Sequence, residues 1–388
     1  MATYKDLDNL LREFADGGVP GCALQIAQKG KTIYEGYFGY SDIDEKTPVT
    51  KDSVFGLASM SKIPLYTVML MLYERGLFNL TDPISNYFPE WKDMKKYVKK
   101  PNGHVRVVPC EKQVTISDTL SMKAGLPYCN SMAPSDNMTL TSMQECMKPL
   151  FDKGTYTIRE QIRAVSETIL AAEPGERWIY GFSSELAAGL IEEVCGKSID
   201  DVFRELLFDP LEMDSMRSDL TENMRQNMVK MYRKKEKGEF EPFTMFGLSP
   251  PGERKQRGWA RLYSNTGDCT KLMQMLANGG TYNGIRIMNA GTINMMRTNG
   301  LSPAQLKDFE DPYNRGYGFG YGVRTLIDKE RANHNGSLGA FGWTGGFGTW
   351  CEADPEDGVS IVYMHCMTPH QELYYHHRMR TVAYGCIE

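Results

Sequence analysis

A serine and a lysine three residues apart, Ser59 and Lys62, are the residues of this sequence best suited to covalent chemistry. They precede an apolar helical pattern from Pro64 to Tyr73, which puts the serine near a helix N-terminus and the lysine one turn later. Residues three apart share a helix face, so the hydroxyl and the amine are neighbours. A lysine that is desolvated at the positive end of a helix favours its neutral amine, and such an amine is a general base beside a nucleophile.

The same residues also have an ordinary structural explanation. Ser59 would then be a helix N-cap, and Lys62 would be a solvated surface charge. A Ser-x-x-Lys spacing is short enough to arise by chance in a chain of 388 residues. The catalytic interpretation therefore depends on partners elsewhere in the chain.

Length and composition restrict the class of protein. A chain of 388 residues with 41% hydrophobic and 24% charged residues suits one large globular domain or two closely joined ones. The net charge of −5 argues against nucleic acid or an anionic membrane as a partner. No apolar run approaches the roughly 20 residues of a membrane span. The N-terminus lacks the apolar core of a signal peptide, so we expect a cytoplasmic protein.

The metal-binding and thiol residues follow no ligand pattern. Nine cysteines are scattered without a Cys-x-x-Cys pair, which predicts reduced, mostly buried thiols. Six histidines include His376-His377 but no His-x-x-x-His. We therefore expect no metal and no cofactor. The expected partner is a small-molecule ester or acyl substrate, with the oligomeric state left open.

Strand signals lie at both ends of the chain. A helix containing Leu7 and Phe14 precedes two strands, 22–27 and 32–38, joined by a turn at Lys29-Gly30. Further strands are predicted at 318–326, 345–353 and 359–365, followed by a helix over 369–384. This order predicts an α+β fold whose single antiparallel sheet is formed by both chain ends and flanked by helices.

The middle of the chain is mainly helical. Helices are predicted from Thr115 to Gly125, from Ser183 or Ser184 to Gly196, after the cap Ser198, and around residues 272–276. Two stretches look less regular: a basic one, 91–109, which we expect to be a solvated face, and 127–155, where Tyr128 is a candidate for the rim of a binding site. Residues 1–64 and 255–388 would form a sheet domain and 65–254 a helical domain, with the active site in the cleft between them.

Four motifs, the first of which contains the serine and the lysine, follow one another in a fixed order. They are the stretch Lys46 to Lys62, the helix Val114 to Leu126, the stretch Pro174 to Ser183 with its Pro-Gly and Tyr180, and the stretch Gly342 to Thr349, which includes Trp343-Thr-Gly and has Asp354-Pro-Glu behind it. No Gly-x-Ser-x-Gly elbow is present. Over nearly its whole length the chain resembles the serine β-lactamase and penicillin-binding superfamily. The likeness is to its class C-like branch, which includes family VIII carboxylesterases.

The resemblance implies a β-lactamase/transpeptidase-like fold and a role for each matching residue. Ser59 would attack a carbonyl and form an acyl-enzyme, and Lys62 and Tyr180 would act as general base and acid. The backbone N–H groups of Ser59 and Gly346 would form the oxyanion hole, the latter on a strand edge that glycines keep open. The alternatives are a buried core tyrosine at Tyr180 and an aromatic core strand at Trp343.

Two departures from the family bear on the substrate. Phe182 stands where its β-lactamases have an asparagine, and Trp343 stands where they have the lysine of Lys-Thr-Gly. Trp343, Thr344, Gly345, Phe182 and Tyr128 are the predicted substrate-binding residues. Aromatic walls in place of polar contacts favour an ester over an anionic peptide-like substrate, although Arg315 or Arg324 remain candidate cations.

We therefore predict a serine hydrolase of the carboxylesterase type. An acyltransferase, a D-amino-acid peptidase or a β-lactamase would use the same site. A family member without catalysis that binds a ligand is the alternative of another class.

Overall fold

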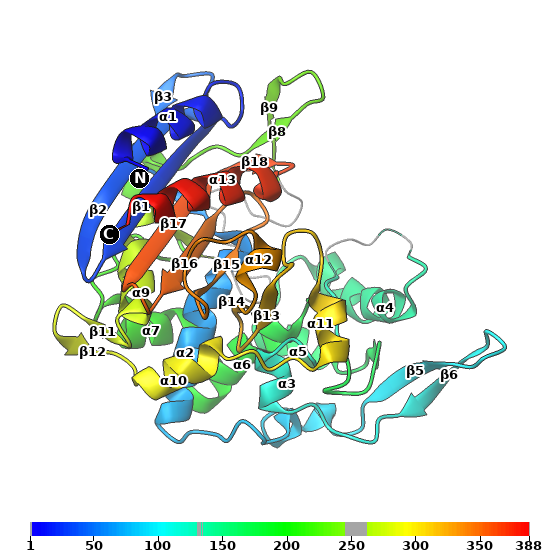
Figure 1. The fold of residues 1–388 in the computed structure, drawn as a ribbon. Helices are drawn as coiled ribbons and strands as arrows, with labels where there is room; N and C mark the ends of the chain where they lie inside the picture. The colour runs from blue at the N-terminus through cyan, green and yellow to red at the C-terminus, as the bar shows by residue number, and fades with distance from the viewer. Residues whose placement is uncertain (1, 130–132, 134, 245–261, 388) are drawn as a thin grey trace.

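The computed structural model describes residues 2–129, 133, 135–244 and 262–387 (Figure 1). Its centre is an eight-stranded sheet in the order β13-β14-β15-β16-β17-β1-β2-β3. The two chain ends join where β1 pairs antiparallel with β17, with Ile26 opposite Ile361. The predicted sheet shared by both ends is confirmed. Its strands are β1 (Gly21–Gln28), β2 (Lys31–Asp42), β3 (Thr47–Pro48), β13 (Tyr317–Phe319), β14 (Arg324–Leu326), β15 (Phe341–Thr344), β16 (Trp350–Asp354) and β17 (Val359–His365).

Helices cover both faces of this sheet. The first and last helices, α1 (Tyr4–Ala15) and α13 (Glu372–Gly385), pack together on one face, and α9 (Thr266–Ala277) contacts β1, β16 and β17 on the other (Figure 1). The apolar stripe of α1, including Leu7 and Phe14, is buried against Tyr363 and Met379. A helix from each end of the chain therefore covers this face of the sheet, and α1 does so with the apolar stripe that its sequence period predicts.

One helix, α2 (Lys62–Glu74), forms the centre of the mainly helical part of the chain. All residues of α2 up to Leu72 are buried, and the helix packs against α6 (Ser183–Cys195). A helix that is apolar on every side belongs in a core, which explains why its first residue is buried as well. The other elements of the helical part are α3 (Ile116–Leu120), α4 (Met138–Lys153), α5 (Ile158–Val165), α7 (Ile199–Phe203), the π turn Arg204–Phe208 and α8 (Glu222–Gln226).

The remaining elements are short. They are β4 (Phe55–Gly56), β5 (Lys95–Lys99), β6 (Val105–Pro109), β7 (Ile169–Leu170), β8 (Tyr232–Lys234), β9 (Phe240–Pro242), β10 (Tyr263–Ser264), β11 (Thr281–Tyr282), β12 (Ile285–Arg286), β18 (Met367–Thr368), α10 (Ala290–Arg297), α11 (Pro303–Phe309), α12 (Lys329–Ala332), and the 3₁₀ turns η1 (Ala58–Ser61), η2 (Ile84–Asn86) and η3 (Pro89–Trp91).

Two helices differ from prediction. The one capped by Thr115 ends at Leu120 rather than at Gly125, because the chain already turns at Met122, where φ is +58°. The stretch 127–155, predicted to be irregular, contains α4, which starts where the Asn137 side chain accepts from the Leu140 N–H. The polar residues of α4 and its internal proline obscured its apolar period. Residues 130–132 and 134 of this stretch lie outside the described residues.

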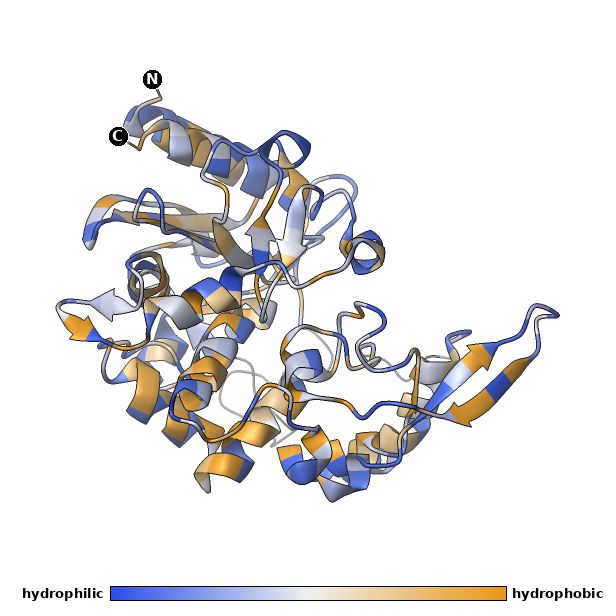
Figure 2. Cartoon of the chain, turned by 60° about the horizontal axis from the view of Figure 1, so that its bottom comes forward, coloured by the Kyte–Doolittle hydropathy of each residue, from blue (hydrophilic) through white to orange (hydrophobic). Residues whose placement is uncertain are grey.

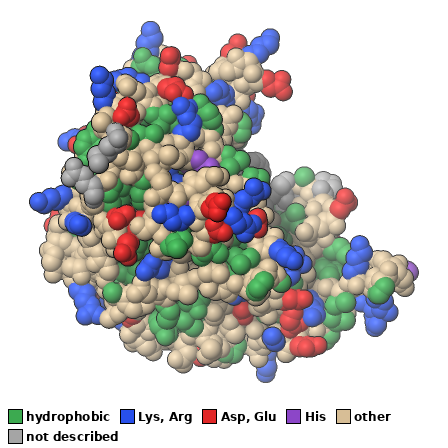
Figure 3. Space-filling view, in the orientation of Figure 1, with side chains coloured by type: hydrophobic (Ala, Val, Ile, Leu, Met, Phe, Trp, Pro, Cys, Tyr) green, Lys and Arg blue, Asp and Glu red, His purple; other side chains and the backbone are tan. Residues whose placement is uncertain are grey.

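The basic stretch 91–109 forms a hairpin that the sequence analysis missed. Strands β5 and β6 pair antiparallel, with Tyr97 opposite Val107, and project from the body (Figure 2). Lysine and arginine side chains are visible on this projection (Figure 3). Its residues are mostly exposed, which agrees with the expected solvated face. The high lysine content hid the strand pattern.

Two predicted strands have different boundaries. The single strand predicted over 318–326 is the hairpin β13–β14, because the chain turns at Gly322 with φ +77°. The strand predicted from residue 345 starts at Trp350, and β15 lies before it, so residues 345–349 form the turn between the two. The predicted domain boundary at 254–255 lies outside the described residues. In the part of the chain that is described, no helix has the length and apolar character of a membrane span.

Candidate active site

Ser59 lies in a turn that is fixed from both sides. The backbone N–H of Leu57 donates to the Leu262 carbonyl at 3.0 Å, and Thr349 Oγ1 donates to the Leu57 carbonyl at 3.0 Å. The next residue, Ala58, has φ +47°, a left-handed conformation that costs a non-glycine residue about 1 kcal/mol. The surrounding bonds hold this conformation, and Ser59 is left partly exposed between buried neighbours.

Lys62 is the first residue of α2 and is 4% exposed. Its Nζ donates to Ser59 Oγ at 3.3 Å. The ordinary structural explanation of the pair does not hold, because Ser61 and not Ser59 is the N-cap of α2, and because Lys62 is buried. The spacing in the sequence therefore predicted a real contact between hydroxyl and amine.

Two tyrosine rings surround the amine of Lys62. Its Nζ lies 5.3 Å from the ring centroid of Tyr128 and 5.1 Å from that of Tyr180. The two rings meet edge to face, with centroids 5.4 Å apart. Ring faces attract a cation, so both tyrosines favour the ammonium form of the lysine. The structure thus places Tyr180 beside the Ser59–Lys62 pair. Tyr128 contacts the lysine amine as well, so it lies at the centre of the site and not only on its rim.

The pKa of Lys62 is shifted in the direction opposite to the one predicted from the sequence. Burial lowers its pKa, but the phenol groups of Tyr128 and Tyr180 and the carboxylate of Glu185 raise it, and the net pKa is above the ordinary value. The groups that face the amine therefore favour its ammonium form, which is the direction opposite to the one expected from desolvation alone. The sequence analysis missed Glu185, whose signal was an acidic residue in the first turn of α6.

Trp343 contacts the predicted catalytic tyrosine directly. Its Nε1–H donates to the Tyr180 hydroxyl at 3.0 Å, and the two ring centroids are 5.4 Å apart. Trp343 is 5% exposed, and the ring of Phe319 packs edge to face against it at 5.3 Å. The indole N–H can stabilise negative charge that develops on the Tyr180 oxygen during proton transfer.

Two neighbouring glycines link β15 to the serine turn. A Cβ at Gly345 would lie 2.3 Å from the Leu57 carbonyl oxygen, whereas a Cβ at Gly346 would meet no atom within 4 Å. Gly346 lies in the turn after β15, which corrects its expected place on a strand edge. Within the described ranges, neither the Ser59 N–H nor the Gly346 N–H donates to a protein acceptor. Both amides are therefore available, and their role as an oxyanion hole remains a prediction.

Phe182 and the two candidate arginines lie in less open surroundings. Phe182 is 3% exposed in the main apolar core, and its role as a substrate-binding wall stays a prediction. Arg324 is 1% exposed and donates to the Tyr313 hydroxyl at 3.0 Å. Arg315 is largely exposed and faces Glu310 at 3.7 Å. These partners argue against either arginine as a cation for the substrate.

Thr344 has a partner that the sequence did not indicate. Its Oγ1 lies 3.1 Å from the Thr349 carbonyl and 3.2 Å from Glu372 Oε2. Glu372 is the first residue of α13, and the sequence pattern indicates it only as part of a terminal helix. The structure thus adds a carboxylate beside one of the predicted substrate-binding residues.

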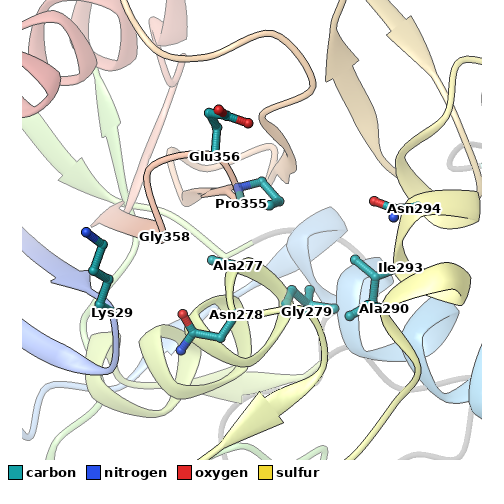
Figure 4. A pocket seen from close by; sticks show the side chains of 11 residues that line it. Lys29, Ala277, Asn278, Gly279, Ala290, Ile293, Asn294, Pro355, Glu356 and Gly358 are labelled. Atoms are coloured by element: carbon teal, nitrogen blue, oxygen red, sulfur yellow. The ribbon is translucent and has the colours of Figure 1, made fainter.

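A separate pocket of about 470 Å³ lies elsewhere on the molecule (Figure 4). It contains none of the predicted site residues, so it is distinct from the surroundings of Ser59. Its lining residues are Lys29, Leu276, Ala277, Asn278, Gly279, Ala290, Ile293, Asn294, Pro355, Glu356 and Gly358.

In the described part of the chain, no group of three or more His, Cys, Asp or Glu side chains is arranged to hold a metal ion.

Comparison with known proteins gives the family. An uncharacterised protein of Mycobacterium tuberculosis (strain CDC 1551 / Oshkosh) is 25% identical over 366 residues, which span 92% of this chain and 88% of the relative. The solved structure of EstCE1, a hydrolase with promiscuous acyltransferase activity, is 23% identical with a TM-score of 0.78 and covers 98% of both chains.

A second solved structure is the simvastatin synthase LovD from Aspergillus terreus. It is 19% identical, with a TM-score of 0.81 over 98% of this chain and 97% of that one. At this level of identity the two structures establish the fold alone. The beta-lactamase family model matches residues 7–377, and the chain belongs to that family.

Proposed function

We propose that this protein is a serine hydrolase that cleaves an ester through an acyl-enzyme on Ser59. The observation that carries the proposal is the 3.3 Å contact between Lys62 Nζ and Ser59 Oγ at the start of a buried helix, with the Tyr180 ring against the same amine. A nucleophile needs a group that takes its proton, and this arrangement supplies one without histidine.

In the proposed reaction, Ser59 Oγ forms a bond to the ester carbonyl carbon, and the carbonyl oxygen becomes an oxyanion held by the N–H groups of Ser59 and Gly346. The oxyanion collapses, and the bond from the carbonyl carbon to the alcohol oxygen breaks. Once the pair has released one proton to solvent, Lys62 and Tyr180 act as one unit that takes the serine proton and then gives it to the leaving oxygen. Water then attacks the carbonyl carbon of the acyl-enzyme while the Lys62–Tyr180 unit takes its proton. The bond from this carbon to Ser59 Oγ breaks, the proton returns to Ser59 Oγ, and the acid is released.

The aromatic residues and the comparison favour an ester as substrate. Trp343 uses its N–H on Tyr180 and offers no charge to a substrate carboxylate. The printed name of EstCE1 describes a hydrolase that also transfers acyl groups. Transfer of the acyl group to an alcohol or amine instead of water is therefore the nearest alternative. A D-amino-acid peptidase and a β-lactamase are the next ones.

Intact mass spectrometry after a short 4-nitrophenyl ester or a fluorophosphonate tests the proposal. We expect an adduct on the parent protein that is absent in Ser59→Ala. The same adduct should persist in Ser61→Ala, because the Ser61 hydroxyl only accepts from the Leu262 N–H. Turnover that survives in Ser59→Ala contradicts the proposal, and failure to label with any probe favours a non-catalytic ligand-binding protein.

Two further assays separate the alternatives. An alcohol added to the ester reaction yields a new ester if the protein is an acyltransferase. Faster hydrolysis of a chromogenic cephalosporin than of the ester favours a β-lactamase.

A further inference from the structure

A carboxylate lies beside the end of the strand that borders the nucleophile. Glu372 Oε2 is 3.2 Å from Thr344 Oγ1, and both side chains are partly exposed, that of Glu372 by 21%. The residue after Thr344, Gly345, packs against the Leu57 carbonyl two positions before Ser59, and the next, Gly346, is exposed. A substrate at Ser59 therefore approaches the strand end at which Glu372 is held.

The Thr344 hydroxyl has no proton left to donate to a ligand. Thr344 Oγ1 has two acceptors within reach, the Thr349 carbonyl at 3.1 Å and the Glu372 carboxylate. A hydroxyl donates one proton at a time. A carboxylate on a substrate would meet an occupied donor and a negative charge.

The groups that face Glu372 compensate its charge only in part. His370 Nδ1 is 3.6 Å from the Glu372 carboxylate. Among the described residues, no other basic group lies within salt-bridge distance of this carboxylate. Burial raises the pKa of Glu372 most strongly, His370 and Arg324 lower it, Asp311 raises it, and the net direction is upward. Because Arg324 is buried and donates to Tyr313, it does not cover the exposed side of the carboxylate.

From these contacts we infer that Glu372 determines the charge selectivity of the Ser59 site: it disfavours esters that carry a free carboxylate and favours neutral or cationic esters. This inference rests on the proposed ester hydrolysis. The physical reason is repulsion between like charges at a partly desolvated position, where one charge changes a rate by about tenfold.

The test compares matched esters at pH 8, which is well above the ordinary pKa of a glutamate side chain. One series varies the acyl part of a 4-nitrophenyl ester, with a neutral, a terminal carboxylate or a trimethylammonium chain of equal length. The other varies the leaving group of an acetate ester in the same three ways. We expect Glu372→Gln to raise kcat/KM for the carboxylate ester relative to the neutral ester by about tenfold in at least one series. The ratio for the cationic ester should fall.

Two control variants separate charge from structure. Glu372→Asp keeps the charge and should keep the selectivity of the parent protein. Glu356→Gln removes a carboxylate from the separate pocket and should leave every ratio unchanged. A loss of helix stability alone would lower all rates together and would not move the ratios.

The outcomes also separate this inference from the function on which it rests. Hydrolysis of the neutral ester with unchanged ratios in Glu372→Gln overturns the inference and leaves the proposed function intact. No hydrolysis of any ester by the parent protein overturns both.

Discussion

Tyr180 lies between two tryptophans that differ in one hydrogen bond. Trp343 Nε1 donates to its hydroxyl at 3.0 Å, whereas Trp178 stacks on its ring at 5.9 Å. In Trp343→Phe a ring remains but the N–H is lost. We expect kcat for an ester to fall about tenfold with a smaller change in KM, because a hydrogen bond of about 1–1.5 kcal/mol no longer supports the charge on Tyr180. Steady-state kinetics measure both constants.

Trp178→Phe is the matched control for this prediction. The Nε1 of Trp178 is buried without a hydrogen-bond partner among the described residues, so its loss removes no bond. We expect less than about a threefold change in kcat, consistent with the small contribution of ring shape alone. An equal loss in both variants would show that ring volume, and not the hydrogen bond, supports Tyr180.

At the scale of single residues, the sequence predicted contacts that short spacing fixes. The three-residue separation of Ser59 and Lys62 is enough to place the two groups on one helix face. Glu185 and Glu372 were missed, since their importance depends on tertiary contacts with Lys62 and Thr344. The direction of the Lys62 pKa was wrong for the same reason, because it depends on which groups face the amine.

The turn from β15 to β16 presses one glycine against the serine turn and leaves its neighbour free. In Gly345→Ala, the new methyl would lie 2.3 Å from the Leu57 carbonyl oxygen and 2.2 Å from Thr349 Oγ1. Backbone has to shift to relieve these contacts. We expect kcat/KM to fall by about 10²-fold, as a displacement of about 1 Å near reacting atoms does, with a loss of about 1–3 kcal/mol in stability.

Gly346→Ala is the comparison for this element, because its methyl would meet no atom within 4 Å. Its melting temperature should match that of the parent protein, while that of Gly345→Ala should fall. Equal melting temperatures for both variants would contradict the packing argument. Calorimetry and ester kinetics on the same samples provide the measurements.

At the scale of elements, the sequence predicted helices and strands with strong caps or clean periods. α1 and the β1–β2 hairpin are of this kind, with a turn at Lys29-Gly30 where φ is +50° and +83°. α4 and the hairpin β5–β6 were missed, because their polar and charged residues mask the apolar pattern. Loop boundaries such as residues 345–349 depend on packing against another segment, which no local pattern records.

Buried histidines make the stability of the whole molecule depend on pH. His365 is fully buried, with hydrogen bonds of 3.1 Å to Tyr363 and to the His370 carbonyl, and burial lowers its pKa to about 3. The unfolded chain binds this proton near pH 6.5 and the folded chain only near pH 3. Between these values the unfolded state binds more protons, so stability falls as the pH falls.

We expect His365→Gln to reduce the slope of unfolding free energy against pH by about 1.4 kcal/mol per unit between pH 6 and 4.5. Part of the slope should remain, because burial also lowers the pKa of His376 and brings that of His377 to about 4. Denaturant titrations at several pH values measure it. His104→Gln, at the exposed hairpin tip, should leave the slope unchanged.

A second buried group acts at lower pH. Burial raises and His334 lowers the pKa of Glu352, and the net value is about 2. The stability it contributes is present above about pH 4.5 and is lost as the pH falls towards 2. This loss lies below the pH range in which His365→Gln is expected to change the slope.

The two ends of the chain meet: a Cβ at Gly385 would lie 2.9 Å from the Cβ of Ala2, and α1 packs against α13. A short linker between these ends, with a new opening at Asn102-Gly103 in the exposed hairpin, would give a circular permutant. In that permutant the strands β13–β17 would precede β1–β3 in the chain, with α13, the linker and α1 between them. The residues of the central β17–β1 pair would then be separated by a short part of the chain instead of almost the whole of it. Because folding slows as contacting residues lie further apart in sequence, we expect the permutant to form its sheet faster than the parent protein.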